Sequence, residues 1–323
     1  MWGHSADEAG NLTQTRKSPR LPGFVLPDSV RVTDDLRRAV AGGGGGGGGR
    51  GRGGAETGMV ISAVPVQFTR EVWFRLKGRT PTSVGALSVA KGIENGTLLR
   101  PTQIIADALG DDPDARPRPI GTLSGPTIAA ELARGLPAAM IASSDAPGFA
   151  GTVQQLLACS YLRIYTTDDL VGVELAGAVK NVIAIAAGII DGLGAGNNAK
   201  SALLARGLAE ITRLGVAMGA SPETFFGLAG MGDLATTCFS PEGRNRTLGE
   251  ALGRGHRLEE YLARTSSVVE GVATAKSVVQ LAGKYRVDMP IVQGVHAVLF
   301  EGLDPIEGIG RLMSREMKAE RVG

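Results

Sequence analysis

The order of hydrophobic and polar positions divides the chain into two parts of different character. From about residue 30 to about residue 166, short β-rich runs alternate with helical runs. The predicted strands are Val30–Thr33, Met59–Val64, Val84–Ala90, Pro119–Ser124, Pro137–Ser143 and Leu162–Thr167. The predicted helices between them are Phe68–Leu76, Leu98–Leu109, Thr127–Arg134 and Gly148–Ala158. This alternation predicts a mainly parallel sheet with helices on both faces, a fold that binds ligands at the carboxyl ends of its strands.

From about Asp168 onward, helical periodicity dominates and clusters of β-branched residues thin out. A serine-proline-glutamate sequence at 221–223, and again at 240–242, is typical of a helix start, with serine as the N-cap and proline in the first turn. A chain of 323 residues is long enough to form two separate cores. We therefore predict an α/β domain over residues 1–167 and an all-helical domain over residues 168–323.

The most apolar segment runs from Leu170 to Ile190 and is long enough to span a bilayer. Glu174 and Lys180 interrupt it, and charges inside a spanning helix are costly. We therefore interpret the segment as a buried helix and predict no membrane span.

Composition excludes several classes of function. The formal net charge is +2 and aromatic residues make up 4% of the chain, which disfavours binding to nucleic acid. The two cysteines, Cys159 and Cys238, are too few for a disulfide framework and indicate a reducing cytoplasm. Neither cysteine has the spacing of a metal ligand, so no metal site is predicted.

A glycine-rich stretch occupies residues 42–54, with Arg50 and Arg52 inside it. No strand leads into it and no helix follows it directly, so its match to a dinucleotide-binding loop carries no meaning. Because such a run cannot bury apolar surface, we interpret it as a flexible, solvated insertion. An RNA-binding arginine-glycine patch is the alternative, although the stretch is short for one.

The segment 172–191 places a single long cation among small residues on one face of a helix. The residues that share this face are Gly177, Lys180, Ala184, Ala187 and Asp191. Partial burial would lower the pKa of Lys180, which suits a lysine acting as acid and base. The alternative is a structural lysine paired with a carboxylate such as Glu174 or Asp191.

Two turns add polar groups with a preference for anions. The glycine-rich segment 227–233 ends in Asp233, and Thr237 follows one helical turn later. Arg244 and Asn245 open the helix after that, where a helix N-terminus and an arginine side chain both favour phosphate. In the first domain, a predicted strand runs into Lys91, and the strand-to-helix turn 123–127 exposes backbone amides that can approach a ligand. Taken alone, the segment 227–233 is better explained as a plain interhelical turn, and the other two segments are explained equally well as ordinary turns.

These segments together resemble the bacterial NAD(P)-dependent glycerol-3-phosphate dehydrogenase family. The most specific stretches are LSGPTIAAELARGLPAAM at 123–140, VELAGAVKNVIAIAAGIIDGLGAGNNAKSALLARGLAEITRLGVAMGA at 173–220 and GLAGMGDLATTCFSPEGRNRTLG at 227–249. The resemblance implies a Rossmann-like dinucleotide-binding domain followed by an all-α substrate domain. It also implies hydride transfer between sn-glycerol 3-phosphate and NAD or NADP in glycerophospholipid synthesis, and a cytoplasmic homodimer.

The resemblance assigns a role to each matching residue. Lys180 matches the proton donor and acceptor of the family, and Lys91 matches a lysine that contacts both substrate and cofactor. The remaining substrate-binding residues are implied to be Gly125, Thr127, Asp233, Thr237, Arg244 and Asn245. The remaining cofactor-binding residues are implied to be Trp2, His4, Ala129, Arg244, Val268 and Glu270.

The sequence departs from the family at two places that concern ligands. Gly243 stands where many relatives have a serine in the phosphate site. Relatives begin with a strand, a G-x-G-x-x-G turn and a helix before the Trp-Gly-His point, whereas Met1 here directly precedes Trp2. We therefore expect the first strand-turn-helix to be missing, the sheet to be split there, and the pyrophosphate site to be absent. Two alternatives stay open: a non-catalytic remnant that acts as a binding or dimerising module, and a related β-hydroxy acid dehydrogenase.

Overall fold

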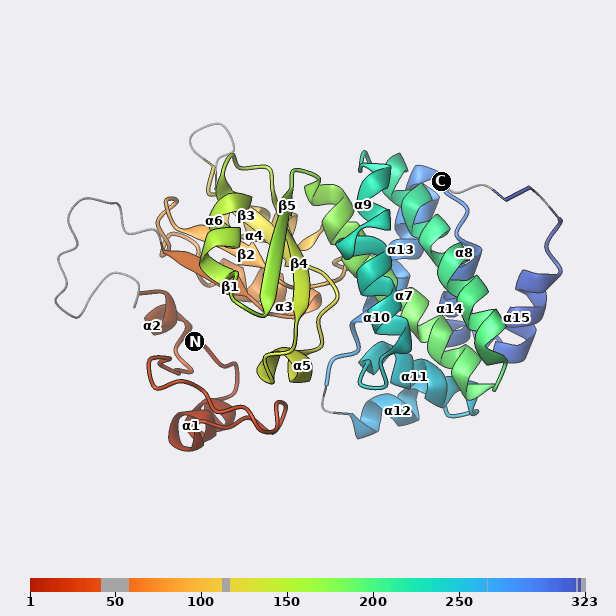
Figure 1. The fold of residues 1–323 in the computed structure, drawn as a ribbon, viewed down its shortest axis with the longest axis horizontal. Helices are drawn as coiled ribbons and strands as arrows, with labels where there is room; N and C mark the ends of the chain where they lie inside the picture. The colour runs from red at the N-terminus through yellow and green to blue at the C-terminus, as the bar shows by residue number, and fades with distance from the viewer. Residues whose placement is uncertain (42–57, 112–116, 266, 318, 321–323) are drawn as a thin grey trace.

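The computed structural model describes residues 1–41, 58–111, 117–265, 267–317 and 319–320. The glycine-rich stretch predicted at 42–54 lies outside these residues. Figure 1 shows a sheet covered by helices on one side of the molecule and a bundle of helices on the other. The sheet has five strands in the order β1-β2-β3-β4-β5. They are β1 (Met59–Ser62), β2 (Gly85–Ser88), β3 (Ile120–Ser124), β4 (Ala138–Ser144) and β5 (Leu162–Thr167).

The sheet is mainly parallel, as the sequence predicts. Only the β3–β4 pair is antiparallel, and the other three neighbouring pairs are parallel. Successive residues of β2 point to opposite faces: Ala86 packs with one set of helices, while Leu87 packs with Phe149 on the other face. The first set contains α2 (Leu36–Ala41), α3 (Val66–Phe74) and α4 (Pro101–Leu109), and the opposite face carries α6 (Phe149–Leu157). Helices therefore cover both faces of the sheet.

The predicted strand Val30–Thr33 is wrong. Only Thr33 makes a ladder contact, an isolated parallel bridge to Trp2 outside the five-stranded sheet. The carbonyl of Val30 instead accepts a 2.9 Å hydrogen bond from the Arg16 guanidinium, and the carbonyl of Arg31 accepts one from the chain's amino terminus. Because these acceptors are already used, the segment has few groups left to build a ladder. Among the described residues, β2 is the only strand that pairs with β1.

Three predicted helices in this part are shorter or shifted. The one predicted at Phe68–Leu76 is α3, which begins earlier, directly after Pro65. The one predicted from Leu98 begins at Pro101, because Leu98 has a φ of 60°, which a right-handed helix does not accommodate. The helix predicted at Thr127–Arg134 is the short α5 (Ala129–Ala133). The N-terminal segment adds α1 (Ala6–Thr15), which we did not predict.

The helical part is built around α7 (Leu170–Gly192). This helix is long and apolar enough to cross a membrane, but 94% of its most apolar window is buried inside the protein, so it is a core helix as predicted. Around it pack α8 (Gly196–Ala217), α10 (Asp233–Phe239), α11 (Arg244–Gly253), α13 (Glu270–Tyr285) and α14 (Pro290–Phe300). The shorter α9 (Pro222–Phe226), α12 (Leu258–Arg264) and α15 (Pro305–Met313) complete it. Figure 1 shows α7 running from the sheet side through the middle of the bundle.

Contact between α7 and α11 is unusually close because glycines line both helices. A Cβ atom at Gly188 of α7 would lie 1.9 Å from the carbonyl oxygen of Arg246, and one at Gly249 of α11 would lie 2.0 Å from that of Ile185. Only glycine fits at these positions. The close approach brings the first turn of α11 beside the buried middle of α7.

Candidate active site

One buried carboxylate, that of Asp233, is shared between two lysines. Lys180 Nζ lies 2.5 Å from Asp233 Oδ1, and Lys91 Nζ lies 2.6 Å from Asp233 Oδ2. Lys180 Nζ also donates to Thr237 Oγ1 at 2.6 Å, and Lys91 Nζ donates to the carbonyl of Gly125 at 3.3 Å. Four segments that are distant in the sequence therefore meet at one polar cluster in an otherwise apolar core.

Local backbone structure explains how these side chains reach one another. Lys180 projects from the middle of α7, and Lys91 follows the carboxyl end of β2. Asp233 is the first residue of α10, directly after a π-helical turn, η1 (Leu228–Gly232). The sequence indicated only a glycine-rich turn here, and such π-helical turns are frequent at functional sites. Gly230 is required inside it, since a Cβ there would lie 2.0 Å from the carbonyl oxygen of Phe225.

Gly125 directly follows β3 and has a backbone conformation that favours glycine. Its φ is 142°, and a Cβ atom there would lie 2.9 Å from Met140 Cα in the neighbouring strand. Thr127 Oγ1 donates to the Gly125 carbonyl at 3.5 Å, which places Thr127 at the border of the cluster. Ser124, next to Gly125, is buried, and its Oγ has no hydrogen-bond partner among the residues that the structure describes. The turn therefore presents an unsatisfied polar atom beside Lys91 and α7.

The charges of the cluster change one another's protonation. Burial lowers the pKa of the Lys180 ammonium to about 8, the Lys91 charge adds to the lowering, and Asp233 opposes it. Burial acts to raise the pKa of the Asp233 carboxyl, but the ammonium groups of Lys91 and Lys180 outweigh burial and hold that pKa below its ordinary value. Lys180 can therefore exchange a proton near neutral pH while Asp233 stays ionised.

A chain of amide hydrogen bonds connects this cluster to α11 and α13. Asn181 Nδ2 donates to the carbonyl of Lys91 at 3.3 Å, and Asn245 Nδ2 donates to Asn181 Oδ1 at 3.0 Å. Asn245 Oδ1 in turn accepts from the backbone N–H of Gly271 at 2.9 Å. We did not predict a role for Asn181 from the sequence. The signal for one was a polar amide directly after Lys180 in an otherwise apolar helix.

Three further candidates gather at the first turns of α11 and α13. Arg244 opens α11, is exposed, and donates to the carbonyl of Val268 at 2.9 Å. Glu270 opens α13, and burial raises the pKa of its carboxyl, opposed by the charges of Arg244, Lys91 and Lys180. Arg244, Val268 and Glu270 therefore form a rim beside the two lysines.

The remaining candidates lie apart from the cluster. Ala129 is exposed at the start of α5. The ring of Trp2 lies 6.0 Å from that of His4 and beneath the Arg75 guanidinium. Within the part of the chain that the structure describes, no hydrogen bond or ion pair links Trp2 or His4 to Lys180.

Lys180 is paired with a carboxylate, as its structural alternative expected, but the partner is Asp233, and the two partners suggested there, Glu174 and Asp191, are wrong. Glu174 accepts from Arg100 and from the N–H and hydroxyl of Thr102, at 2.8 and 2.7 Å for the latter two. Asp191 pairs with Lys200 and Arg246 instead. No group of three metal-ligating side chains occurs in the described ranges.

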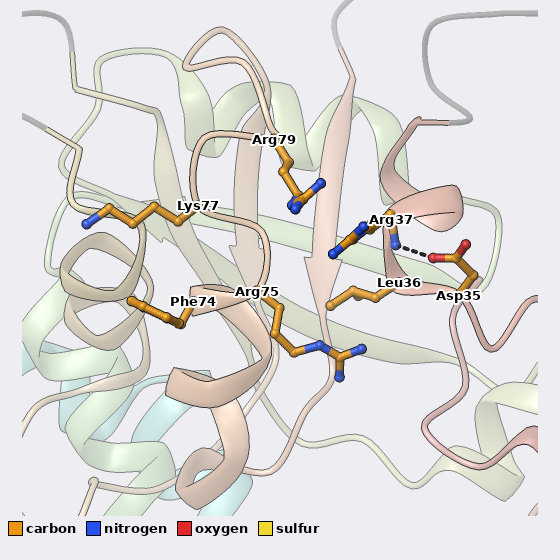
Figure 2. A pocket seen from close by; sticks show the side chains of 7 residues that line it. All are labelled: Asp35, Leu36, Arg37, Phe74, Arg75, Lys77 and Arg79. Carbon is orange, nitrogen blue, oxygen red and sulfur yellow. Dashed lines mark hydrogen bonds between the residues drawn. The ribbon is translucent and has the colours of Figure 1, made fainter.

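A cavity of about 500 Å³ lies away from this site, between the start of α2 and the end of α3. Figure 2 shows its lining, in which the side chains of Arg37 and Arg79 extend toward one another. It shares no residue with the Lys180 cluster. Its three arginines, Arg37, Arg75 and Arg79, are all exposed, so the buried chemistry lies with Lys180 and not here.

Comparisons with known proteins agree on one family. Models of the NAD-dependent glycerol-3-phosphate dehydrogenase N-terminus and C-terminus match residues 49–150 and 169–310. The chain is 43% identical to glycerol-3-phosphate dehydrogenase [NAD(P)+] of Pelotomaculum thermopropionicum, over 98% of this chain and 86% of that protein. It is 44% identical to the enzyme of the same name from Janthinobacterium sp., over 99% and 92%. The crystal structure of glycerol-3-phosphate dehydrogenase from Coxiella burnetii superposes with a TM-score of 0.87 at 33% identity, covering 97% of this chain and 90% of that one.

Proposed function

Because the chain belongs to the NAD-dependent glycerol-3-phosphate dehydrogenase family, we propose that it interconverts sn-glycerol 3-phosphate and dihydroxyacetone phosphate with NAD or NADP. The observation that carries the proposal is the placement of Lys180, buried, bonded to Asp233 and Thr237, and with a pKa of about 8. Reduction of a ketone to a secondary alcohol requires a group that donates a proton to the carbonyl oxygen, and we assign this role to Lys180.

The residues present fit the nicotinamide end of the cofactor. Ser124 offers an unsatisfied hydroxyl, the Glu270 carboxyl lies near enough to Lys91 and Lys180 for their charges to act on its pKa, and the Val268 carbonyl accepts from Arg244. We propose that Lys91, Ala129, Arg244, Val268 and Glu270 hold the cofactor, with Trp2 and His4 toward its adenosine end. The turns after β1 and β2, at residues 63–65 and 89–92, lack the G-x-G-x-x-G spacing that binds pyrophosphate. When bound, the nicotinamide supplies or accepts the hydride.

Lys180 performs the proton transfer. In the reducing direction its ammonium donates a proton to the C2 oxygen of dihydroxyacetone phosphate while C2 is reduced. In the oxidising direction the neutral amine takes the hydroxyl proton of sn-glycerol 3-phosphate. Asp233 holds the ammonium in place and compensates its charge, and Thr237 fixes its direction. Lys91, on the other oxygen of Asp233, contributes a second positive charge that attracts the substrate.

The phosphate group of the substrate is assigned to the first turn of α11. Asn245 is held by two hydrogen bonds, and Arg244 provides the preferred planar donor for phosphate oxygens. Backbone N–H groups at the start of this ten-residue helix add to the attraction. Gly243 supplies no hydroxyl, so the site relies on its arginine, amide and backbone donors. Gly125 and Thr127 border the substrate on the sheet side.

We further propose that the protein acts in the cytoplasm, as a homodimer, and supplies sn-glycerol 3-phosphate for glycerophospholipid synthesis. Both cysteines are unpaired thiols, which fits a reducing compartment. A formal net charge of +2 and an aromatic content of 4% favour a small phosphorylated substrate over a nucleic-acid partner.

The test is a substrate profile. Oxidation of NADH and NADPH is followed with dihydroxyacetone phosphate, with dihydroxyacetone and with a β-keto acid. We expect turnover with the phosphorylated ketone at a kcat/KM at least ~100-fold above that for the other two, because phosphate contacts supply binding energy remote from C2. Preference for the β-keto acid would favour a β-hydroxy acid dehydrogenase. A folded protein without any turnover would favour the non-catalytic binding module.

A further inference from the structure

Asp191, one residue before the end of α7, connects α7 with α8 and with α11. Its carboxylate lies 2.9 and 2.7 Å from Lys200 Nζ on α8, through Oδ1 and Oδ2 respectively. Its Oδ2 also accepts a 2.7 Å hydrogen bond from Arg246 Nε on α11. The side chains of Lys200, Arg246 and Asp191 are 7%, 16% and 20% exposed, so solvent screens this cluster only in part.

Each partner of Asp191 leads to a residue of the proposed site. Arg246 directly follows Asn245 and lies two positions after Arg244, in the first turn of α11. The ammonium of Lys200 lies 4.9 Å from the centre of the Phe239 ring, at the end of α10, the helix that begins with Asp233. The Asp191 carboxylate therefore lies on the helix of the proton donor, α7, and bonds directly to α11, which carries the phosphate donors. Through Lys200 it is also linked to α10, which carries Asp233.

We propose that Asp191 is a positioning residue that sets the first turn of α11, and with it the phosphate donors, relative to Lys180. The inference rests on the proposed function and extends it to residues that touch neither substrate nor cofactor. Without the carboxylate, Lys200 and Arg246 would face each other as cations in a poorly screened site, and the 3.5 Å ion pair of Arg246 with Glu250, on the same helix, would offset only part of the charge. Their repulsion would push the start of α11 away from α8 and α7.

Glycine packing alone does not fix this geometry. Gly188 and Gly249 set how closely α7 and α11 approach, because their contacts are with backbone atoms. Such contacts resist compression but leave sliding and rotation of α11 open. The charge-assisted hydrogen bond from Arg246 to Asp191 is directional, so it restrains the sliding and rotation that the glycine contacts permit.

The experiment compares Asp191→Asn with Asp111→Asn as a matched control. Asp111 is also a partly buried aspartate paired with an arginine, Arg118, at 2.9 Å, but it lies in the α/β part, outside the cluster. Three quantities are measured: the Kd for sn-glycerol 3-phosphate by calorimetry, kcat/KM for dihydroxyacetone phosphate, and kcat/KM for dihydroxyacetone. For Asp191→Asn we expect Kd to rise ~10-fold and kcat/KM for dihydroxyacetone phosphate to fall ~10-fold or more, while dihydroxyacetone changes less than ~2-fold. Asp111→Asn should leave all three near wild type.

An equal fall with both ketones, or an unchanged Kd, would overturn the proposal and reduce Asp191 to a stabilising residue. Should Asp191→Asn not fold, Arg246→Lys carries the same test, because it keeps the charge but loses the Nε contact, and a rise in Kd is again expected. Asp191→Glu, which keeps the carboxylate, should recover part of the affinity. Wild-type protein that binds sn-glycerol 3-phosphate without turnover would contradict the dehydrogenase proposal and leave this inference standing, whereas wild-type protein that does not bind it contradicts this inference.

Discussion

Replacing Gly188 by alanine tests whether close packing of α7 against α11 is required for the fold and the site. The added Cβ would lie 1.9 Å from the carbonyl oxygen of Arg246, 2.7 Å from the backbone nitrogen of Glu250 and 2.9 Å from the carbonyl carbon of Arg246. Real Cβ atoms essentially never come within 3.0 Å of such neighbours, and these neighbours are helix backbone that cannot rotate away. The two helices must therefore separate by roughly 1 Å, which opens the packing along both.

Overpacking of this kind costs about 3 kcal/mol or more, at the upper end of the usual range, because no flexible side chain can yield. That corresponds to a fall of roughly 6 °C or more in the midpoint of thermal unfolding. The matched control is Gly283→Ala in α13, where nothing lies within 4 Å of the added Cβ. There the same change should stabilise by about 0.5 to 1 kcal/mol, since alanine is the better helix former.

The assay is thermal and urea unfolding of the three proteins, followed by circular dichroism, with kcat/KM for dihydroxyacetone phosphate measured at 25 °C. Separation of the helices moves Arg244 and Asn245 away from Lys180, so the loss of activity in Gly188→Ala should exceed the loss of folded protein. An unchanged midpoint for Gly188→Ala, or an equal fall in Gly283→Ala, would refute the packing argument.

Three further predictions follow from buried charges. Since the pKa of Lys180 is lowered to about 8, kcat/KM for oxidising sn-glycerol 3-phosphate should rise with pH through about 8, and kcat/KM for the reduction should fall there, as steady-state pH profiles will show. Glu174→Gln leaves Arg100 buried without its counter-charge and should lower the free energy of unfolding by about 3 to 5 kcal/mol, measured in urea. Burial raises the pKa of Glu210, which accepts from the N–H groups at the start of α14, from 4.5 to about 7. The unfolded carboxyl ionises first, so wild-type stability should decline by up to about 3 kcal/mol between pH 4.5 and 7, and Glu210→Gln should lack that decline in urea titrations.

Local sequence patterns, such as runs of apolar and β-branched residues, were sufficient to predict most of the strands of the sheet. The prediction Leu162–Thr167 matches β5 residue for residue. A run of alternating residues that is rich in β-branched and aromatic side chains strongly favours a strand. The strand at Val30–Thr33 failed because its carbonyl groups bond to Arg16 and to the amino terminus, which no local pattern reveals. Helix starts were likewise displaced where one residue, such as Leu98, takes a left-handed conformation.

The partners of Lys180 could not be predicted from spacing. Helical periodicity pointed to Glu174 and Asp191 because both lie on the same helix, whereas the actual partner, Asp233, is 53 residues away. The partner of a buried lysine is the carboxylate that the tertiary fold brings within ion-pair distance. A single sequence does not show which residues the fold brings together. The family resemblance named Asp233 and Thr237 as ligand residues, but their contact with Lys180 became visible only in three dimensions.

The central claim is that Lys180 exchanges the proton in hydride transfer. The most direct measurement is the turnover of dihydroxyacetone phosphate with NADH and NADPH in wild type, in Lys180→Ala and in the control Lys276→Ala, an exposed lysine on α13 that lies over the ring of Phe300. We predict a loss of at least ~100-fold in kcat for Lys180→Ala, with cofactor binding retained, and near-wild-type turnover for Lys276→Ala. Full activity in Lys180→Ala would contradict the account.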